Sequence, residues 1–171
     1  MSTKQIKKEK VEELLTELKE HLAPMTLNLI GINIKQIGYT EEGLHLIEEA
    51  IDQMYRVGSK VSSFYVPFGF YLGQTIIENI PGAKWHLEDV AHIDDIAVLI
   101  GSDTNGHMAY PFRRIQKFWE DRTDGIVAMY KMVDMTVHNM DMIKNAPEKQ
   151  WIQLPNGVQF RVTKEMKKKE D

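Results

Sequence analysis

The sequence contains no cysteine among its 171 residues. Disulfide bonds, thiolate metal ligands and a cysteine nucleophile are therefore excluded, and a reducing compartment is the natural location. No apolar run approaches the ~18 residues of a membrane-spanning helix, and the Lys-rich residues 1–10 lack the apolar stretch of a signal peptide. We therefore expect a cytoplasmic protein that does not enter a membrane.

Motifs that mark common enzyme classes are also missing. No serine lies in Gly-x-Ser-x-Gly, no glycine-rich loop ends in Gly-Lys-Ser/Thr, and no His-Glu-x-x-His pattern is present. Ser62 and Ser63 precede an apolar segment, so we expect one of them to cap a helix, and Ser102 lies in a predicted turn. The remaining composition, 43% hydrophobic and 27% charged, is typical of one globular domain.

Charge is distributed unevenly along the chain. The net charge is −4, but residues 1–10 carry four Lys and one Glu, and residues 163–171 carry four Lys and three acidic residues. The body between these ends is therefore more acidic than the whole chain and would repel a phosphate backbone, so we expect no nucleic-acid partner. We predict a single domain over residues 1–171, with basic flexible ends at about residues 1–5 and 164–171.

Hydrophobic periodicity predicts a first amphipathic helix over about residues 5–22, which we expect Pro24 to stop. Its apolar stripe consists of Val11, Leu14, Leu15, Leu18 and Leu22. Residues 25–39 fit both an extended segment and a helix. Gly31 and Gly38 favour an extended, ordered connection for this segment.

Four more helices are predicted downstream, at about residues 41–57 and 63–80, from residue 111, and over about 125–144. Thr40 is a good N-cap for the first of these, and Gly58 suits the position just past its end. The helix that ends near residue 80 is apolar nearly all round. It should therefore be the central helix of the fold.

Short segments rich in β-favouring residues predict an antiparallel sheet. Three of them, separated by turn signals, form a predicted meander: Lys84–Glu88, Ile96–Ile100 and His107–Tyr110. Two more, at 151–154 and 158–162, flank Pro155-Asn156-Gly157, which predicts a C-terminal hairpin with a tight Asn-Gly turn. The predicted fold class is α+β, with a small antiparallel sheet (the three-strand meander plus the C-terminal hairpin) packed with about five helices.

Three motifs in the middle of the chain carry a resemblance to a known family. They are Gly-x-Tyr-Leu-Gly at Gly69–Gly73, Gly-x-x-Trp at Gly82–Trp85 and Pro-Phe-x-x-x-x-Lys at Pro111–Lys117. Together with Tyr-Thr-Glu-Glu-Gly-Leu at residues 39–44, they resemble an uncharacterised family of bacterial domains over roughly residues 30–135. The resemblance implies binding rather than catalysis, because some relatives are regarded as partner proteins or immunity factors. Many members have Glu where this chain has Gln74, which removes any acidic role at that position.

The richest polar cluster in the sequence lies between the first two predicted strands. It consists of His86, Glu88, Asp89, His92, Asp94 and Asp95. Imidazole and carboxylate groups together suit zinc or manganese, and on a strand the side chains of His86 and Glu88 would share one side. The candidate ligands are His86, Glu88, His92 and Asp94. The competing interpretation is an exposed acidic turn, and we predict no cofactor.

Two smaller polar groups are further candidates. Asp134 and His138 lie four residues apart on the last predicted helix, where they could form an acid–base pair or a surface ion pair. Arg113 and Arg114, with Lys117, could bind a phosphate or a carboxylate. The alternative is that these three cations partly neutralise the acidic body.

The last predicted helix is rich in methionine. Met129 and Met140 fall on its apolar stripe, whereas Met132, Met135 and Met142 lie off it. If these three are exposed, they would form an adaptable surface for a partner.

These observations predict a non-enzymatic, bacterial, cytoplasmic binding or interaction protein, with an immunity-type role as one version. The predicted binding residues are Met132, Met135, Met142, Arg113 and Arg114, and the partner is a protein or a second copy of the chain. A small metal-assisted hydrolase using the cluster from His86 to Asp95 is the alternative. A nucleic-acid regulator is the least favoured class, because the body is acidic and no helix-turn-helix signature is present.

Overall fold

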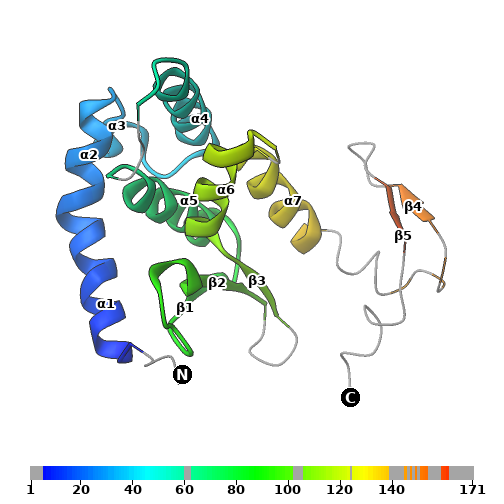
Figure 1. The fold of residues 1–171 in the computed structure, drawn as a ribbon. Helices are drawn as coiled ribbons and strands as arrows, with labels where there is room; N and C mark the ends of the chain where they lie inside the picture. The colour runs from blue at the N-terminus through cyan, green and yellow to red at the C-terminus, as the bar shows by residue number, and fades with distance from the viewer. Residues whose placement is uncertain are drawn as a thin grey trace.

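A computed structural model describes residues 6–59, 63–101, 106–123, 125–138, 145, 147, 149, 151–153 and 159–161. Within these residues the chain forms the predicted α+β fold, in which helices pack with a three-stranded antiparallel sheet (Figure 1). The described residues contain six α-helical segments when α1, η1 and α2 are counted as one continuous rod. The predicted flexible ends, 1–5 and 164–171, lie outside the described residues.

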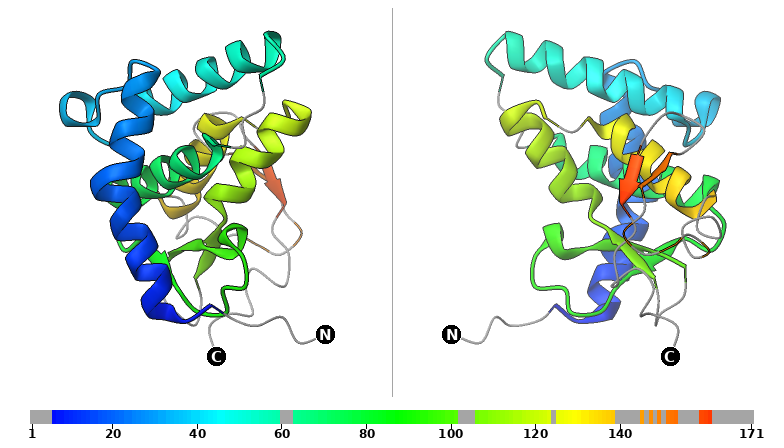
Figure 2. Two further views of the ribbon diagram at one scale, coloured as in Figure 1. Left: turned by 60° about the vertical axis from the view of Figure 1, so that its left-hand side comes forward. Right: turned by 90° about the vertical axis from the view of Figure 1, so that its right-hand side faces the viewer.

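The rod consists of α1 (Lys8–Glu17), the π-helical turn η1 (Leu18–Leu22) and α2 (Ala23–Leu29). It lies along one edge of the fold in Figure 1 and in the left view of Figure 2. The predicted stop at Pro24 is therefore wrong. Pro24 directly follows the π-helical turn, and the rod continues through it as α2.

The predicted extended connection over residues 25–39 is also wrong. Most of it is helical, because α2 continues to Leu29 and a short helix, α3 (Ile34–Ile37), follows. Gly31 and Gly38 adopt positive φ angles of 82° and 66°, so they end α2 and α3 instead of extending the chain. Helical spacing also places Leu27 in the core, with none of its surface exposed.

Helix α4 (Glu41–Arg56) begins and ends as predicted. The Thr40 hydroxyl accepts a hydrogen bond from the Gly43 amide at 3.2 Å, which confirms the N-cap. Gly58 follows the helix with φ at 68°.

The prediction of a serine cap for the next helix is not borne out at Ser63, because Phe64 is the N-cap residue of α5 (Tyr65–Asn79) and makes no side-chain cap bond. Ser62 lies outside the described residues.

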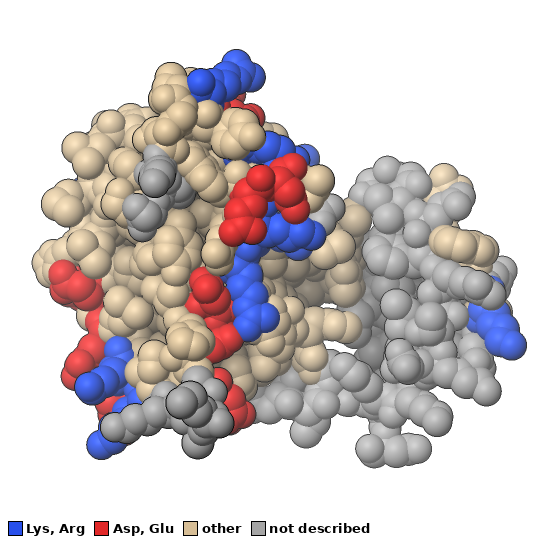
Figure 3. Space-filling model, in the orientation of Figure 1, with Lys and Arg blue, Asp and Glu red and all other residues tan. Residues whose placement is uncertain are grey.

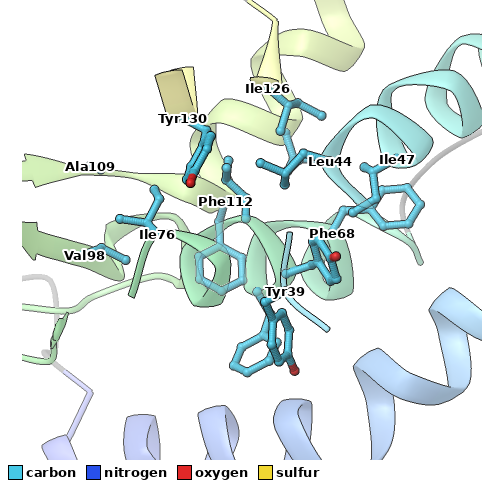
Figure 4. Close-up of a cluster of buried hydrophobic side chains, with 14 of the residues drawn as sticks. Tyr39, Leu44, Ile47, Phe68, Ile76, Val98, Ala109, Phe112, Ile126 and Tyr130 are labelled. Carbon is cyan, nitrogen blue, oxygen red and sulfur yellow. The ribbon is translucent and has the colours of Figure 1, made fainter. Parts of the chain in front are cut away.

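Helix α5 is the central helix, as predicted from its apolar sequence. All residues from Pro67 to Ile76 are buried. Figure 4 shows Leu44, Ile47, Phe68, Ile76, Val98, Phe112 and Ile126 among the buried side chains of this core. No helix in the described part of the chain is long and apolar enough to cross a membrane.

The predicted meander is confirmed. Strands β1 (Lys84–His86), β2 (Ala97–Ile100) and β3 (His107–Ala109) form an antiparallel sheet in the order β1-β2-β3. In this register Trp85 pairs with Val98, and Val98 pairs with Ala109, so these three share one face of the sheet. A single 3₁₀ turn, η2 (Ile93–Asp95), lies between β1 and β2.

Two helices follow the sheet. They are α6 (Pro111–Asp121), which begins at proline as predicted, and α7 (Ile126–His138). Residues 139–144, to which the last helix was predicted to run, lie outside the described residues. Strands β4 (Trp151–Gln153) and β5 (Gln159–Arg161) pair antiparallel. The predicted turn at 155–157 lies outside the described residues, so the C-terminal hairpin stays a prediction.

Candidate functional site

The two glycines of the Gly-x-x-x-Gly pair on α5 give aromatic rings room against the helix. A Cβ atom on Gly73 would come within 2.1 Å of Cη2 of Trp85, and one on Gly69 within 2.5 Å of Cδ1 of Phe112. The Trp85 ring also stacks on Phe70 with 5.9 Å between centroids. These residues therefore join α5 to β1 and α6 inside the core.

The tyrosine of the same motif joins α5 to the start of α4. The Tyr71 hydroxyl donates to the Gly38 carbonyl at 2.8 Å and accepts from the Thr40 amide at 3.2 Å. A Cβ atom on Gly43 would overlap this hydroxyl, at 1.8 Å. The aromatic and glycine residues of the family-like motifs thus shape the interior and offer no reactive group at the surface.

Gln74 is one of the few buried polar residues, with 7% of its surface exposed. Its side-chain amide donates to Glu78 at 3.1 Å, and its oxygen accepts from the Trp85 indole at 3.3 Å. A glutamate at this position would bring a second carboxylate close to Glu78. Glutamine instead supplies one donor and one acceptor, and both have partners.

The polar cluster between β1 and β2 holds the backbone in a turn. Oδ2 of Asp95 accepts from the backbone amides of Ala91 and His92, at 3.2 and 2.9 Å. His92 and Asp95 together cap the turn η2 at its N-terminus. The Tyr65 hydroxyl donates to Asp94 at 3.4 Å. His92, Asp94 and Asp95 are therefore engaged in local structure.

The candidate metal ligands are not brought together. His86 is half-buried at the end of β1, Glu88 and His92 are exposed, and Asp94 faces Tyr65. Across the residues that the structure describes, no group of three or more His, Asp or Glu side chains could hold a metal ion.

Arg113 lies on α6 and contacts the same turn. Its guanidinium forms an ion pair with Asp95 and lies 4.7 Å from the centre of the Tyr110 ring. Hydrogen bonding by the His92 amide, together with Arg113, holds the pKa of Asp95 below its usual value. Arg114 is half-buried on α6, and Lys117 is exposed. One of the two arginines predicted for binding is thus used to attach α6 to η2.

Asp134 and His138, the pair predicted on α7, contact each other at the protein surface. Nδ1 of His138 lies 3.0 Å from Oδ1 of Asp134 and 2.9 Å from the Asp134 carbonyl oxygen. The side chain of His138 is 63% exposed. This geometry is that of a surface contact between residues four apart on a helix, which is an ion pair when His138 is protonated, the alternative given above.

The methionines of the last helix divide between core and surface. Met129 is buried, at 8% exposure, and Met132 is exposed, at 48%. Met135 is half-buried, and Met140 and Met142 lie outside the described residues. The three-methionine surface on this helix therefore stays a prediction, with one of its members exposed.

A different apolar surface lies on α2, and the sequence reasoning missed it. Leu22, Met25 and Leu29 expose 37%, 61% and 75% of their surface. They follow one another at spacings of three and four residues, so they share one face of the helix, which we call the α2 face. Ala23 and Leu27, on the opposite side of the same helix, have no exposed surface.

The π-helical turn explains why the α2 face points outward. The buried positions of the rod are Val11, Leu15, Leu18, Ala23 and Leu27. The step from Leu18 to Ala23 is five residues long, one more than a regular α-helix would use to return to the same side. The turn therefore moves the core-facing side from Leu22, where periodicity predicted it, to Ala23.

Residues 22–34, which include the α2 face, contain no charged side chain. In Figure 3 the surface over α2 and α3 is accordingly largely tan, whereas acidic and basic side chains gather over other elements. The longer uncharged run at residues 61–77 contains the buried helix α5. The uncharged run at residues 22–34 was the signal in the sequence that could have pointed to the α2 face. Its position on the surface becomes visible only in the structure.

The described fold and its surfaces define an α+β domain with an outward apolar helix face. Comparison of the chain with protein-family models, with curated proteins and with solved structures finds no match in any of the three.

Proposed function

We propose that this protein works by binding another protein chain through the α2 face, without catalysing a reaction. The observation that carries the proposal is the exposure of Met25 and Leu29, at 61% and 75%, on a helix whose opposite side is fully buried. These side chains are not the edge of a core stripe. They lie on the side of α2 that points away from the core.

Energetics support a contact at this face. Full burial of one Leu or Met side chain contributes about 1.5–3 kcal/mol. Covering Leu22 together with the largely exposed Met25 and Leu29 can therefore supply the few kcal/mol that a central cluster gives to many interfaces. A face of this kind with no contact would instead expose the protein to aggregation.

The roles of the polar residues support a function without catalysis. Two of the polar groups have structural roles: Asp95 caps the turn η2, and Gln74 makes buried hydrogen bonds. The α2 face itself contains no acid, base or nucleophile. A contact surface made only of Leu and Met is suited to binding and not to group transfer.

The resemblance to the bacterial family extends the proposal to a cytoplasmic, immunity-type role, in which the bound protein is toxic. In that version, cells that carry the toxin survive with the wild-type protein and lose protection with Leu29→Glu. Survival with this variant at wild-type level would contradict the immunity-type role through the α2 face.

Site-specific photo-crosslinking in cells tests the proposal. A photoreactive amino acid is placed at position 29 in one variant and at position 57 in the control, because Leu29 and Val57 are similarly exposed, at 75% and 79%, on different helices. We expect a discrete protein adduct from position 29 and none from position 57. Adducts from position 57 alone, or from neither position, would contradict binding through the α2 face.

A further inference from the structure

We infer that the occupant of the α2 face is the α2 face of a second copy, with the two helices crossing antiparallel about a two-fold axis. The inference rests on the proposed function, because it names the partner of the same surface. Three features of the α2 face point to a copy of itself: its lack of charge, the placement of its three side chains, and the position of the charged part of the rod.

The lack of charge removes the usual obstacle to self-pairing. A surface with charge of one sign repels its own copy, and this chain carries a net charge of −4. The α2 face has no charge from residue 22 to residue 34, and its flanking side chains, Thr26 and Asn28, are uncharged polar groups. Two copies can therefore meet here without opposing like charges.

The placement of the side chains is compatible with two-fold symmetry. Leu22 and Leu29 are seven residues apart, about two helical turns, and Met25 lies close to their midpoint. When one helix is turned antiparallel to the other about this midpoint, Leu22 meets Leu29 of the second copy, and the reverse contact forms at the other end. Met25 then lies near the axis, beside its own copy.

The charged part of the rod stays out of this contact. Helix α1 carries Lys and Glu side chains, and it precedes α2 along the same rod. In an antiparallel crossing each α1 extends past the Leu29 end of the other α2, so the two charged segments do not face each other. A parallel pairing would place them side by side.

The expected dimer is weak. A single crossing of two short helices falls at the low end of protein interfaces, below about 1,200 Å² in total. We therefore expect association that depends on concentration in the micromolar range or above. An anionic lipid surface is a poorer occupant, because the body of the protein is acidic and the α2 face has no Lys or Arg to attract lipid headgroups.

The test is sedimentation velocity of the purified full chain over a wide concentration range. We expect a shift from monomer to dimer for the wild type. Met25→Glu and Met25→Lys should each weaken the association by about tenfold or more, because each places two like charges near the axis. An equimolar mixture of the two variants should recover a dimer at least as tight as the wild type.

Val57→Glu is the matched control, since it adds the same charge at an exposed apolar side chain on α4 and should leave the association unchanged. Circular dichroism melting of each variant checks that the fold is kept. Wild-type protein that stays monomeric at all concentrations overturns the two-fold dimer, as does a dimer that Met25→Glu leaves intact. Binding of a monomer to anionic lipid vesicles would also overturn the two-fold dimer.

The failure of the dimer is distinguishable from the failure of the proposed function. A monomer whose position 29 still crosslinks a different protein in cells keeps the binding function and loses only the second copy as partner. A monomer without any adduct from position 29 loses both.

Discussion

The amide of Ala23 donates a hydrogen bond to the carbonyl of Leu18, five residues earlier, and neither residue has exposed surface. In a regular α-helix the bond spans four residues, so this one marks an extra residue in the rod. The extra residue keeps Leu18 and Ala23 on the core side, and it turns Leu22, Met25 and Leu29 outward. The candidate binding surface is thus a direct consequence of one π-helical turn.

Deletion of Glu20, an exposed residue inside the π-helical turn, should be tolerated when it is made in a Pro24→Ala background, because proline inside a regular α-helix would itself cost about 3 kcal/mol. The deletion leaves Leu18 and Ala23 four positions apart, so an ordinary α-helix can still bury both. We expect retained helical circular dichroism and a change in the free energy of unfolding of no more than roughly 1 kcal/mol, measured by urea denaturation.

Deletion of Glu13 in the same Pro24→Ala background is the matched control. Glu13 is also exposed, but it lies in the regular part of α1 between the buried residues Val11 and Leu15. Its removal rotates Val11 by ~100° relative to Leu15 and Leu18 and moves it to the edge of the buried stripe. We expect a loss of about 2 kcal/mol, more than for the Glu20 deletion. Equal effects of the two deletions would contradict the account of the π-helical turn.

Gly73→Ala should destabilise the protein by about 1–3 kcal/mol, because its Cβ atom would collide with the Trp85 ring. Trp85→Phe removes the part of the indole that occupies this space. In a double-mutant cycle by chemical denaturation, the double variant should therefore lose less stability than the sum of the single variants, by roughly 0.5 kcal/mol or more. Strict additivity would show that the ring and the glycine do not depend on each other.

Tyr71→Phe should lower the free energy of unfolding by about 1–3 kcal/mol. The substitution keeps the ring and removes only the hydroxyl, so the Gly38 carbonyl and the Thr40 amide lose their partner. Tyr55→Phe, at a tyrosine that is 54% exposed, should change stability by less than about 0.5 kcal/mol. If the two variants unfold at the same urea concentration, the hydrogen bonds of Tyr71 do not support the fold.

The raised pKa of Tyr39 predicts a loss of folding stability at high pH. Burial, with a smaller effect of Glu78, raises the pKa of Tyr39 from 10.0 to about 12. The folded state therefore holds the phenol proton more tightly than the unfolded state does. This contribution is complete below pH ~10 and is lost as the pH rises through about 12.

Absorbance at the phenolate band checks this prediction. Tyr39 should ionise near pH 12 in the folded protein, and this part of the signal should be missing in Tyr39→Phe. The variant should also lose less stability than the wild type between pH 10 and 12. Ionisation of Tyr39 at the pH of an exposed tyrosine would contradict its raised pKa.

Sequence patterns were sufficient where one local signal decided the structure. Thr40 and Gly58 defined the ends of α4, and the apolar sequence of α5 placed it at the centre. The rod was predicted wrongly because its outcome depends on tertiary packing. A π-helical turn has no signature in hydrophobic periodicity, and Pro24 is tolerated only because of where that turn places it.

The candidate site could be predicted less well than the fold. Leu22 was assigned to the core stripe, since the sequence alone gives no reason to insert an extra residue after Leu18. The polar cluster from His86 to Asp95 was rich in suitable ligands, but sequence spacing could not reveal that Asp95 caps η2 and pairs with Arg113. The exposure of Met132 on α7 leaves the predicted methionine surface as a rival to the α2 face.

Hydroxyl-radical footprinting compares these two surfaces directly, because Met25 and Met132 are similarly exposed, at 61% and 48%, on different helices. Oxidation of both methionines is measured by mass spectrometry in dilute purified protein and in living cells. The account predicts that the ratio of Met25 to Met132 oxidation falls in cells, because a bound chain covers the α2 face. An unchanged ratio, or selective protection of Met132, would contradict it.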